Sequence, residues 1–167
     1  MQYNNVILIG MPGSGKTTLG TELSRVLGYG YIDSDSLIVA REGKRLCEII
    51  AEVGTEGFLD IEARVNAEIS TNTCVIATGG SAIYRDYAMQ KLKTLGVVVY
   101  LKYSYEVIAS RLGDLKKRGV AMKDGFTLKD LYNERAPLYE KYADIVVDLD
   151  NSSVQESVAK VMRALEK

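Results

Sequence analysis

Residues 6–17 read VILIGMPGSGKT, and this segment frames the interpretation of the whole chain. From Gly10 to Thr17 it fits the pattern G-x-x-x-x-G-K-[ST] at every fixed position. An apolar run precedes the pattern, and the segment after it has a helical apolar face made of Leu19, Leu23, Val26 and Leu27. Glycines let the backbone turn tightly and direct N–H groups at phosphate oxygens, and a helix N-terminus adds partial positive charge. The segment therefore predicts a buried strand, a phosphate-binding loop and a helix.

The loop also predicts which residues hold a nucleoside triphosphate. In this pattern the lysine reaches the terminal phosphates and the hydroxyl binds Mg²⁺, so these roles fall to Lys16 and Thr17. A GTPase would need an NKxD motif to recognise guanine and a DxxG switch, and neither occurs in the sequence. We therefore expect a nucleoside triphosphate with Mg²⁺, its polyphosphate held by Gly13, Ser14, Gly15, Lys16, Thr17 and Thr18, in a protein that is no GTPase of the NKxD type.

Outside the loop, short apolar runs alternate with helical patterns. The further runs are apolar at mostly consecutive positions, which is typical of strands buried on both faces of a parallel sheet; they cover residues 29–32, 74–77, 96–101 and 145–147. Helical stripes lie between and after them at Phe58, Ile61, Val65 and Ile69, at Val107, Ile108 and Leu112, and at Val154, Val158, Val161, Met162 and Leu165. Ser153 and Glu156 are spaced as a capping box for the last helix. This alternation predicts one three-layer α/β/α domain over residues 1–167, with right-handed crossovers.

The composition excludes several classes of function. The 167 residues contain no histidine, which rules out Ser-His-Asp triads and HExxH zinc sites. Lys and Arg number 21 against 22 Asp and Glu, so there is no general charge that would attract nucleic acid or an acidic membrane. Cys47 and Cys74 form no CxxC pair, which indicates a reduced intracellular protein without a structural zinc. The apolar runs are too short to span a bilayer and the start lacks signal-peptide features, so we expect a cytoplasmic protein.

Two aspartates follow the second apolar run, in the sequence YIDSD. Ligands of open α/β sheets bind at the carboxyl ends of strands, so Asp33 could hold Mg²⁺, directly or through water. Asp35 could then orient the acceptor hydroxyl or take its proton. The structural alternative is a helix cap, which is common at a strand-to-helix turn. Asp148, after the run 145–147, competes with Asp33 for the metal; we favour Asp33 because it follows the loop helix directly and has a second carboxylate two residues on.

Three more segments are candidates for the acceptor side of the site. Gly79 and Gly80 follow the run 74–77 and permit close backbone approach to a ligand, although a tight turn would use the same residues. The charged, glycine-punctuated stretch 113–125 fits either a solvated surface loop or a mobile lid. Beyond it, Arg135 could bind an acidic substrate or a transferring phosphoryl group, although a lone arginine more often forms a surface ion pair.

Together these segments resemble the shikimate kinase family over nearly the whole chain. The resemblance rests on GMPGSGKTTLG, YIDSD, FLDIE, ATGGS, the candidate lid and LYNERAPLY. It implies a five-stranded parallel sheet of order 2-3-1-4-5, ATP as donor, shikimate as acceptor and a lid at about residues 113–126. The roles it implies are Lys16 and Thr17 on the phosphates and metal, Asp33 near magnesium, Asp35 on the acceptor, Gly79 and Gly80 at the substrate, Arg111 on adenine, Arg118 on the phosphates from the lid, and Arg135 on the substrate carboxylate.

The sequence departs from the family pattern on the acceptor side. The family has an arginine directly after the phenylalanine of its F-R-x-x-E motif; here Phe58 and Glu62 remain, but Leu59 replaces that arginine. The missing arginine is half of the family's carboxylate clamp, and leucine offers no hydrogen-bond donor in its place. Arg64 lies five positions on, about 140° round a helix, so it cannot simply substitute. The third glycine of the family is Ser81, which keeps its N–H and adds bulk.

The lid departs from the pattern as well. The family's lid arginine is usually followed by proline, whereas Gly119 follows Arg118 in this chain. The sequence therefore leaves the lid cation open among Lys116, Lys117 and Arg118.

The leading hypothesis is an ATP-dependent kinase that converts shikimate to shikimate 3-phosphate and acts as a monomer. One alternative is a kinase of another small hydroxylated acid or alcohol, because the acceptor side is altered. A second alternative is a nucleotide-binding protein without catalysis, which the intact Lys16, Thr17 and Asp35 argue against and Leu59 keeps open.

Overall fold

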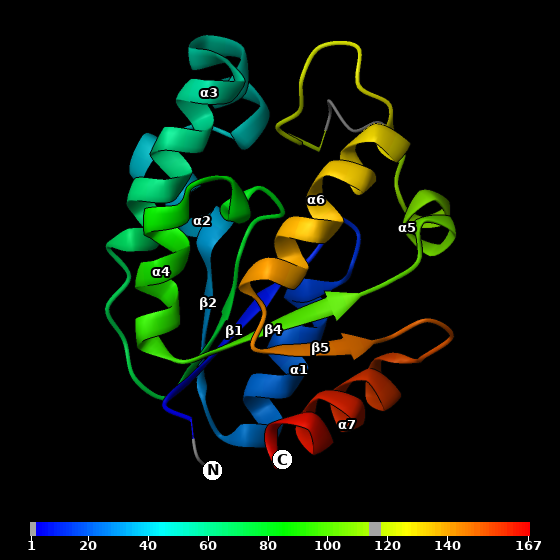
Figure 1. Ribbon diagram of the computed structural model, residues 1–167. Coiled ribbons are helices and arrows are strands. Elements are labelled where there is room, and N and C mark those ends of the chain that lie inside the picture. The colour runs from blue at the N-terminus through cyan, green and yellow to red at the C-terminus, as the bar shows by residue number, and fades with distance from the viewer. Residues whose placement is uncertain (1–2, 114–117) are drawn as a thin grey trace.

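A computed structural model describes residues 3–113 and 118–167 of the chain. Its centre is a parallel sheet of five strands in the order β2-β3-β1-β4-β5 (Figure 1), which confirms the predicted α/β class and strand order. The strands are β1 (Asn5–Ile9), β2 (Gly30–Asp33), β3 (Cys74–Ala77), β4 (Val97–Lys102) and β5 (Ile145–Asp148). Each lies within one residue of its predicted apolar run. The central strands β1, β3 and β4 are almost wholly buried and must be apolar on both faces, whereas the edge strands β2 and β5 are partly exposed.

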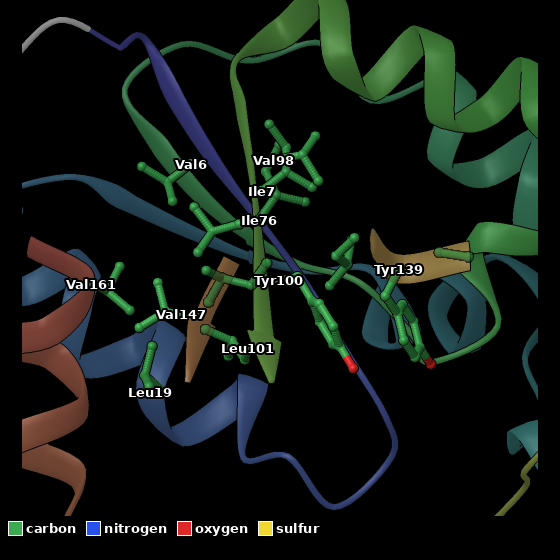
Figure 2. Packing of buried hydrophobic residues seen from close by; sticks show 14 of the residues in the cluster. Val6, Ile7, Leu19, Ile76, Val98, Tyr100, Leu101, Tyr139, Val147 and Val161 are labelled. Carbon is green, nitrogen blue, oxygen red and sulfur yellow. The ribbon is translucent and has the colours of Figure 1, made fainter. Parts of the chain in front are cut away.

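Helices cover both faces of this sheet. They are α1 (Lys16–Leu27), α2 (Ser34–Glu42), α3 (Leu46–Ala67), α4 (Asp86–Leu95), α5 (Tyr105–Arg111), α6 (Leu128–Tyr142) and α7 (Val154–Leu165), with a short 3₁₀ helix η1 at Ala82–Tyr84. Figure 2 shows Leu19 of α1 and Val161 of α7 on one side of the strands and Tyr139 of α6 on the other. Tyr139 stacks on Tyr100 of β4, with ring centroids 5.0 Å apart.

The predicted helices are present, with shifted ends. The stripe that begins at Phe58 belongs to α3, which starts twelve residues earlier and is kinked at Gly54, where φ is 77°. The predicted capping box of α7 is confirmed: the Ser153 hydroxyl accepts a hydrogen bond from the Glu156 N–H, and the Glu156 carboxylate accepts one from the Ser153 N–H. The sequence patterns did not predict α2, α4 or α6, and α6 contains Pro137.

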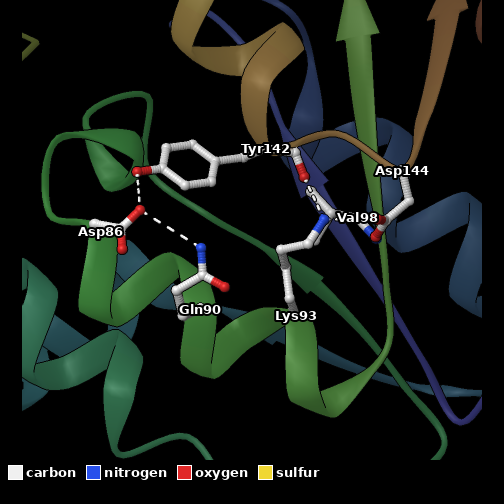
Figure 3. A network of polar contacts seen from close by, with 6 residues as sticks. All are labelled: Asp86, Gln90, Lys93, Val98, Tyr142 and Asp144. Atoms are coloured by element: carbon white, nitrogen blue, oxygen red, sulfur yellow. Dashed lines mark hydrogen bonds and ion pairs between the residues drawn. The ribbon is translucent and has the colours of Figure 1, made fainter.

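A polar network fixes α6 against the sheet (Figure 3). The Lys93 ammonium on α4 donates to the backbone carbonyl of Tyr142, 2.9 Å away, and to the Asp144 carboxylate. Asp144 also accepts a hydrogen bond from the Val98 N–H of β4. The Tyr142 hydroxyl donates to Asp86 at the start of α4. These bonds hold the end of α6 in place, and α6 carries a candidate site residue, Arg135.

The register aligns the carboxyl ends of the strands that carry the candidate residues. Asp33 of β2 pairs with Ala77 of β3, and Ala77 pairs with Leu8 of β1. The phosphate loop, YIDSD and ATGGS therefore begin at one edge of the sheet, where α/β proteins bind ligands. In the described residues, no helix is long and apolar enough to cross a membrane.

Candidate functional site

The phosphate loop connects β1 to α1 in the conformation that its glycines permit. Gly13 and Gly15 have φ values of 79° and 75°, which few other residues adopt. Gly15 is the N-cap of α1, and no side chain of the described residues caps the helix there; its first turn also contains no acidic residue. The first N–H groups of α1 and its positive dipole end therefore suit an anion, as the motif predicted.

The Lys16 side chain folds back over the loop. Its ammonium donates hydrogen bonds to the carbonyls of Gly10 and Met11, at 2.7 and 2.8 Å, and to the Ser14 hydroxyl at 3.2 Å. Burial lowers its pKa to about 8, and the carboxylates of Asp35 and Asp33 partly oppose that shift. A polyphosphate beside this ammonium would favour its charged form.

Thr17 and Asp33 meet beside the loop. The Thr17 hydroxyl donates to Asp33 Oδ2 at 3.1 Å, so two oxygens lie together where the motif predicts magnesium. Mg²⁺ prefers oxygen ligands and usually takes one or two from the protein and the rest from phosphate and water, so this pair fits the ion. Asp33 also caps α2 through the Ser36 N–H, so the structural alternative and the metal site use the same side chain. The competing Asp148 ends β5, at the opposite edge of the sheet from β2.

An acceptor pocket lies next to the loop. The side chains and backbone that line it come from the phosphate loop, α2, α3, the end of β3, α6 and the segment 119–121: Pro12, Asp35, Leu46, Phe58, Glu62, Gly79, Gly80, Ser81, Gly119, Val120, Ala121 and Arg135. The pocket contains both glycines that the sequence predicted, and their lack of a side chain is required. A Cβ on Gly80 would lie 2.8 Å from Pro12 and 2.9 Å from the Arg135 guanidinium.

Arg135 is buried, with 1% of its surface exposed, so it is no surface ion pair. Its Nε donates to the Tyr84 hydroxyl at 3.2 Å, and Nη2 donates to the Ala121 carbonyl at 2.5 Å. Tyr84 in turn donates to Glu134, and this carboxylate accepts a second bond from Lys123. The guanidinium is thus held in one orientation toward the pocket, which suits recognition of a carboxylate.

Two carboxyl groups share the opposite wall of this pocket. A Cβ on Gly79 would lie 2.6 Å from both Asp35 Oδ1 and Glu62 Oε2, so the two oxygens converge on the same glycine. Burial raises the pKa of Asp35, and the nearby Asp33 raises it further while Lys16 lowers it. Burial raises the pKa of Glu62 to about 7, against a hydrogen bond from Ser81 that lowers it. The sequence marks Glu62 only as the last residue of the FLDIE motif and predicts no role for it; its spacing three residues after Leu59 on one helix face was the available signal.

Leu59, which replaces an arginine of the family pattern, belongs to an apolar cluster. It is 5% exposed and packs in a group with Ile38, Ile49, Phe58, Val65 and Ala121. Of that group, Phe58 and Ala121 line the pocket. Among the described lining residues Arg135 is therefore the sole basic group, opposite the carboxyl groups of Asp35 and Glu62.

The candidate lid is described in part. Lys116 and Lys117 lie outside the described residues, so the structure does not test them as lid cations. Arg118 is exposed and does not line the acceptor pocket. The residues directly after it do: Gly119, Val120 and Ala121 face the start of α3. The contact of Arg118 with phosphate therefore stays a prediction.

A second hollow lies on the outer side of the phosphate loop. It is lined by Ser14, Gly15, Thr18, Leu19, Tyr103, Arg111, Ser152, Val154 and Ser157. The Arg111 guanidinium lies over the Tyr103 ring at 4.3 Å and donates to the Gly13 carbonyl at 3.3 Å. A planar cation stacked in this way can take a flat base on its other face. The hollow joins Arg111 to the loop, as the predicted adenine contact requires. It adds Tyr103 and Ser152, which the sequence patterns did not single out, and Val154, which they named only as part of a helical face.

Comparison with known proteins gives consistent matches. A family model described as shikimate kinase matches residues 12–166. The shikimate kinase of Thermodesulfovibrio yellowstonii is 34% identical over 166 residues, which cover 98% of this chain and 95% of the relative. That of Clostridium botulinum strain Okra is 37% identical over 169 residues, covering 98% and 96%. The structure of the shikimate kinase from Acinetobacter baumannii in complex with shikimate superposes with a TM-score of 0.89 at 31% identity, covering 98% of this chain and 93% of that one. The Aquifex aeolicus enzyme gives 0.82 at 32% identity, covering 97% and 96%.

Proposed function

The chain belongs to the shikimate kinase family, and from this membership we propose how its residues transfer a phosphoryl group from ATP to shikimate. It is an ATP-dependent kinase with shikimate as its acceptor. The observation that carries the proposal is the convergence of Lys16, Asp35 and Arg135 at one edge of the sheet, where the phosphate loop and the acceptor pocket share Pro12 as a neighbour. The two alternatives, another acceptor or a protein without catalysis, have no support in the comparisons.

On the donor side, the loop residues 13–18 bind the polyphosphate through backbone N–H groups, and Lys16 leaves its carbonyl partners to contact the terminal phosphates. Arg111 stacks on the adenine, and Arg118 reaches the phosphates when the lid 113–126 closes. Thr17 and Asp33 would hold Mg²⁺, which would supply positive charge to offset that of the transferring phosphoryl group.

On the acceptor side, the substrate carboxylate binds the guanidinium of Arg135, and the backbone at Gly79 and Gly80 lies against the ring. The reacting hydroxyl, at C3, lies at Asp35. As its oxygen forms a bond to the γ-phosphorus and the bond to the β-phosphate oxygen breaks, its proton passes to the Asp35 carboxylate. The raised pKa of Asp35 makes this carboxylate a better proton acceptor than an exposed aspartate. We also propose a single domain that acts as a cytoplasmic monomer.

The test is ADP release with shikimate, ATP and Mg²⁺, followed by analysis of the phosphorylated product. We expect turnover that requires shikimate and yields the 3-phosphate. Lys16→Ala should abolish that turnover and weaken ATP binding, because it removes the ammonium group from the polyphosphate. Lys91→Ala, an exposed lysine of α4, is the control and should leave both unchanged. Nucleotide affinity that survives Lys16→Ala unchanged would contradict the donor site.

A further inference from the structure

The acceptor pocket contains one ionisable group more than the proposed contacts of shikimate use. Among its described lining residues the ionisable groups are Asp35, Glu62 and Arg135, two acids against one base. The carboxylate of an acceptor accounts for Arg135, and the reacting hydroxyl accounts for Asp35. Glu62 then has no assigned partner on the acceptor, although it lies on the same wall as Asp35.

Glu62 is buried with one oxygen unsatisfied. The residue is 1% exposed, and Oε1 accepts a hydrogen bond from the Ser81 hydroxyl at 2.7 Å. Oε2 is buried and has no hydrogen-bond partner among the described residues. It lies beside Gly79, 2.6 Å from the place that a Cβ on this glycine would take, and both residues line the pocket. Leaving a buried carboxylate oxygen unpaired is costly, so its persistence at a binding site indicates a partner that arrives with the ligand.

None of the described donors around Glu62 bonds to Oε2. The Lys16 ammonium bonds to the carbonyls of Gly10 and Met11, and the Arg135 guanidinium bonds to Tyr84 and Ala121. Leu59, one turn before Glu62 on α3, offers an apolar side chain where the family pattern has an arginine. The hydroxyl of Ser81, which stands where the family has glycine, already serves Oε1. Both departures from the family pattern therefore border this one carboxylate.

We propose that Glu62 determines acceptor specificity by binding a hydrogen-bond donor of the acceptor at Oε2, so that the enzyme also accepts zwitterionic analogues of shikimate. In such a ligand the carboxylate binds Arg135, the reacting hydroxyl lies at Asp35 and an ammonium group binds Glu62, which balances the two acids and one base of the pocket. The inference rests on the proposed function. In shikimate, a hydroxyl that does not react would take the place of the ammonium group as an uncharged donor to Oε2.

The kinetic test compares shikimate with two analogues in which the hydroxyl at C4 or C5 is replaced by an amino group. The measured quantity is kcat/KM for each amino analogue divided by kcat/KM for shikimate. We expect this ratio, for at least one analogue, to be tenfold or more higher in the unmodified enzyme than in Glu62→Gln, which keeps the shape and removes the charge. Asp60→Asn, an exposed carboxyl on the same helix that pairs with Arg85, is the matched control and should keep the original ratio.

A binding measurement tests the same point without turnover. Isothermal titration calorimetry at pH 7, in buffers of different ionisation enthalpy, counts the protons released when a ligand binds. The groups that face Glu62 are Ser81, Asp35, Arg135, Lys16 and Tyr139. An ammonium group at Oε2 favours the ionised carboxyl, so the amino analogue should release more protons than shikimate does. Glu62→Gln should erase this difference. Protons exchanged by Asp35 and Lys16 are counted alike in the unmodified enzyme and in Glu62→Gln, so they do not affect the comparison.

The outcomes separate the two proposals. If the unmodified enzyme does not phosphorylate shikimate, the proposed function fails, and the calorimetry still tests Glu62. If shikimate is phosphorylated and Glu62→Gln changes kcat/KM for all three acceptors by one common factor, the specificity role is overturned and Glu62 is only structural. Should Glu62→Gln fail to fold, Glu62→Asp replaces it: the shorter side chain withdraws Oε2 from the pocket and should lower the ratio in the same way, and an unchanged ratio would overturn the proposal.

Discussion

The phosphate loop lies within nine consecutive residues, 10–18, whereas the charged groups of the acceptor pocket come from three helices: Asp35 on α2, Glu62 on α3 and Arg135 on α6. The loop binds through its backbone, whose course depends on glycines at fixed positions. The pocket binds through side chains, and each of them can change without moving the others. Departures from the family pattern can therefore accumulate on the acceptor side, as they have at Leu59 and Ser81, while the donor side keeps its motif intact.

The largest effect that would sharpen this comparison is expected at Asp35, where the two sides meet. Asp35→Asn removes the group that takes the proton of the acceptor hydroxyl and should lower kcat by about 10²–10⁴-fold. Because the phosphate loop is untouched, the affinity for ATP should stay the same. Steady-state kinetics and nucleotide titration measure the two quantities. A loss of ATP binding as large as the loss of kcat would mean that the donor and acceptor sides are not separable.

A smaller effect is expected at Leu59. Leu59→Arg places a guanidinium one turn from Glu62 and next to the pocket, so it can pair with Oε2 and attract the shikimate carboxylate. We expect the KM for shikimate to fall by about tenfold, which corresponds to one charged hydrogen bond of roughly 1.5 kcal/mol. The ratio of kcat/KM for the amino analogues to kcat/KM for shikimate should fall, because the new cation repels an ammonium group.

Leu59→Met is the control for this change, since it keeps an apolar side chain of similar volume. Its KM for shikimate should stay close to that of the unmodified enzyme. If Leu59→Arg folds and its KM is also unchanged, the carboxylate is held elsewhere in the pocket.

The smallest effect concerns stability. An unfolded chain ionises Glu62 near the ordinary pKa of 4.5, whereas the folded chain keeps the proton up to about 7. The folded state binds more protons between these values, so this group's contribution to stability is complete below pH 4.5 and is lost as the pH rises through 7. Glu62→Gln removes the loss, and its free energy of unfolding relative to the unmodified protein should increase from pH 5 to pH 8 by about 1–3 kcal/mol.

Urea unfolding at the two pH values measures this difference. Asp60→Asn serves again as the control and should show no such change, because Asp60 is exposed. A stability difference for Glu62→Gln that is the same at pH 5 and pH 8 would show that the carboxyl is ionised, or neutral, throughout.

Much of the fold could be predicted because the sheet is buried on both faces. Every strand appeared as a run of apolar residues, and the loop motif identified the strand that leads into the phosphate site. The helices α2, α4 and α6 could not be predicted in the same way. Part of what holds them is long-range, such as the bond of Lys93 to the carbonyl of Tyr142.

For the site, the sequence by itself determined the donor side, since a backbone nest is encoded in consecutive residues and its chemistry needs no distant partner. It also named Asp35, Gly79, Gly80 and Arg135 one by one. Only the tertiary structure decided that these residues line one pocket, that Arg135 is its sole base among the described lining residues, and that Glu62, which also lines it, has one oxygen without a hydrogen-bond partner in the described part of the chain. The physical reason is that burial and the pairing of charges depend on side chains brought together from distant parts of the chain, and no local pattern records which of them will meet.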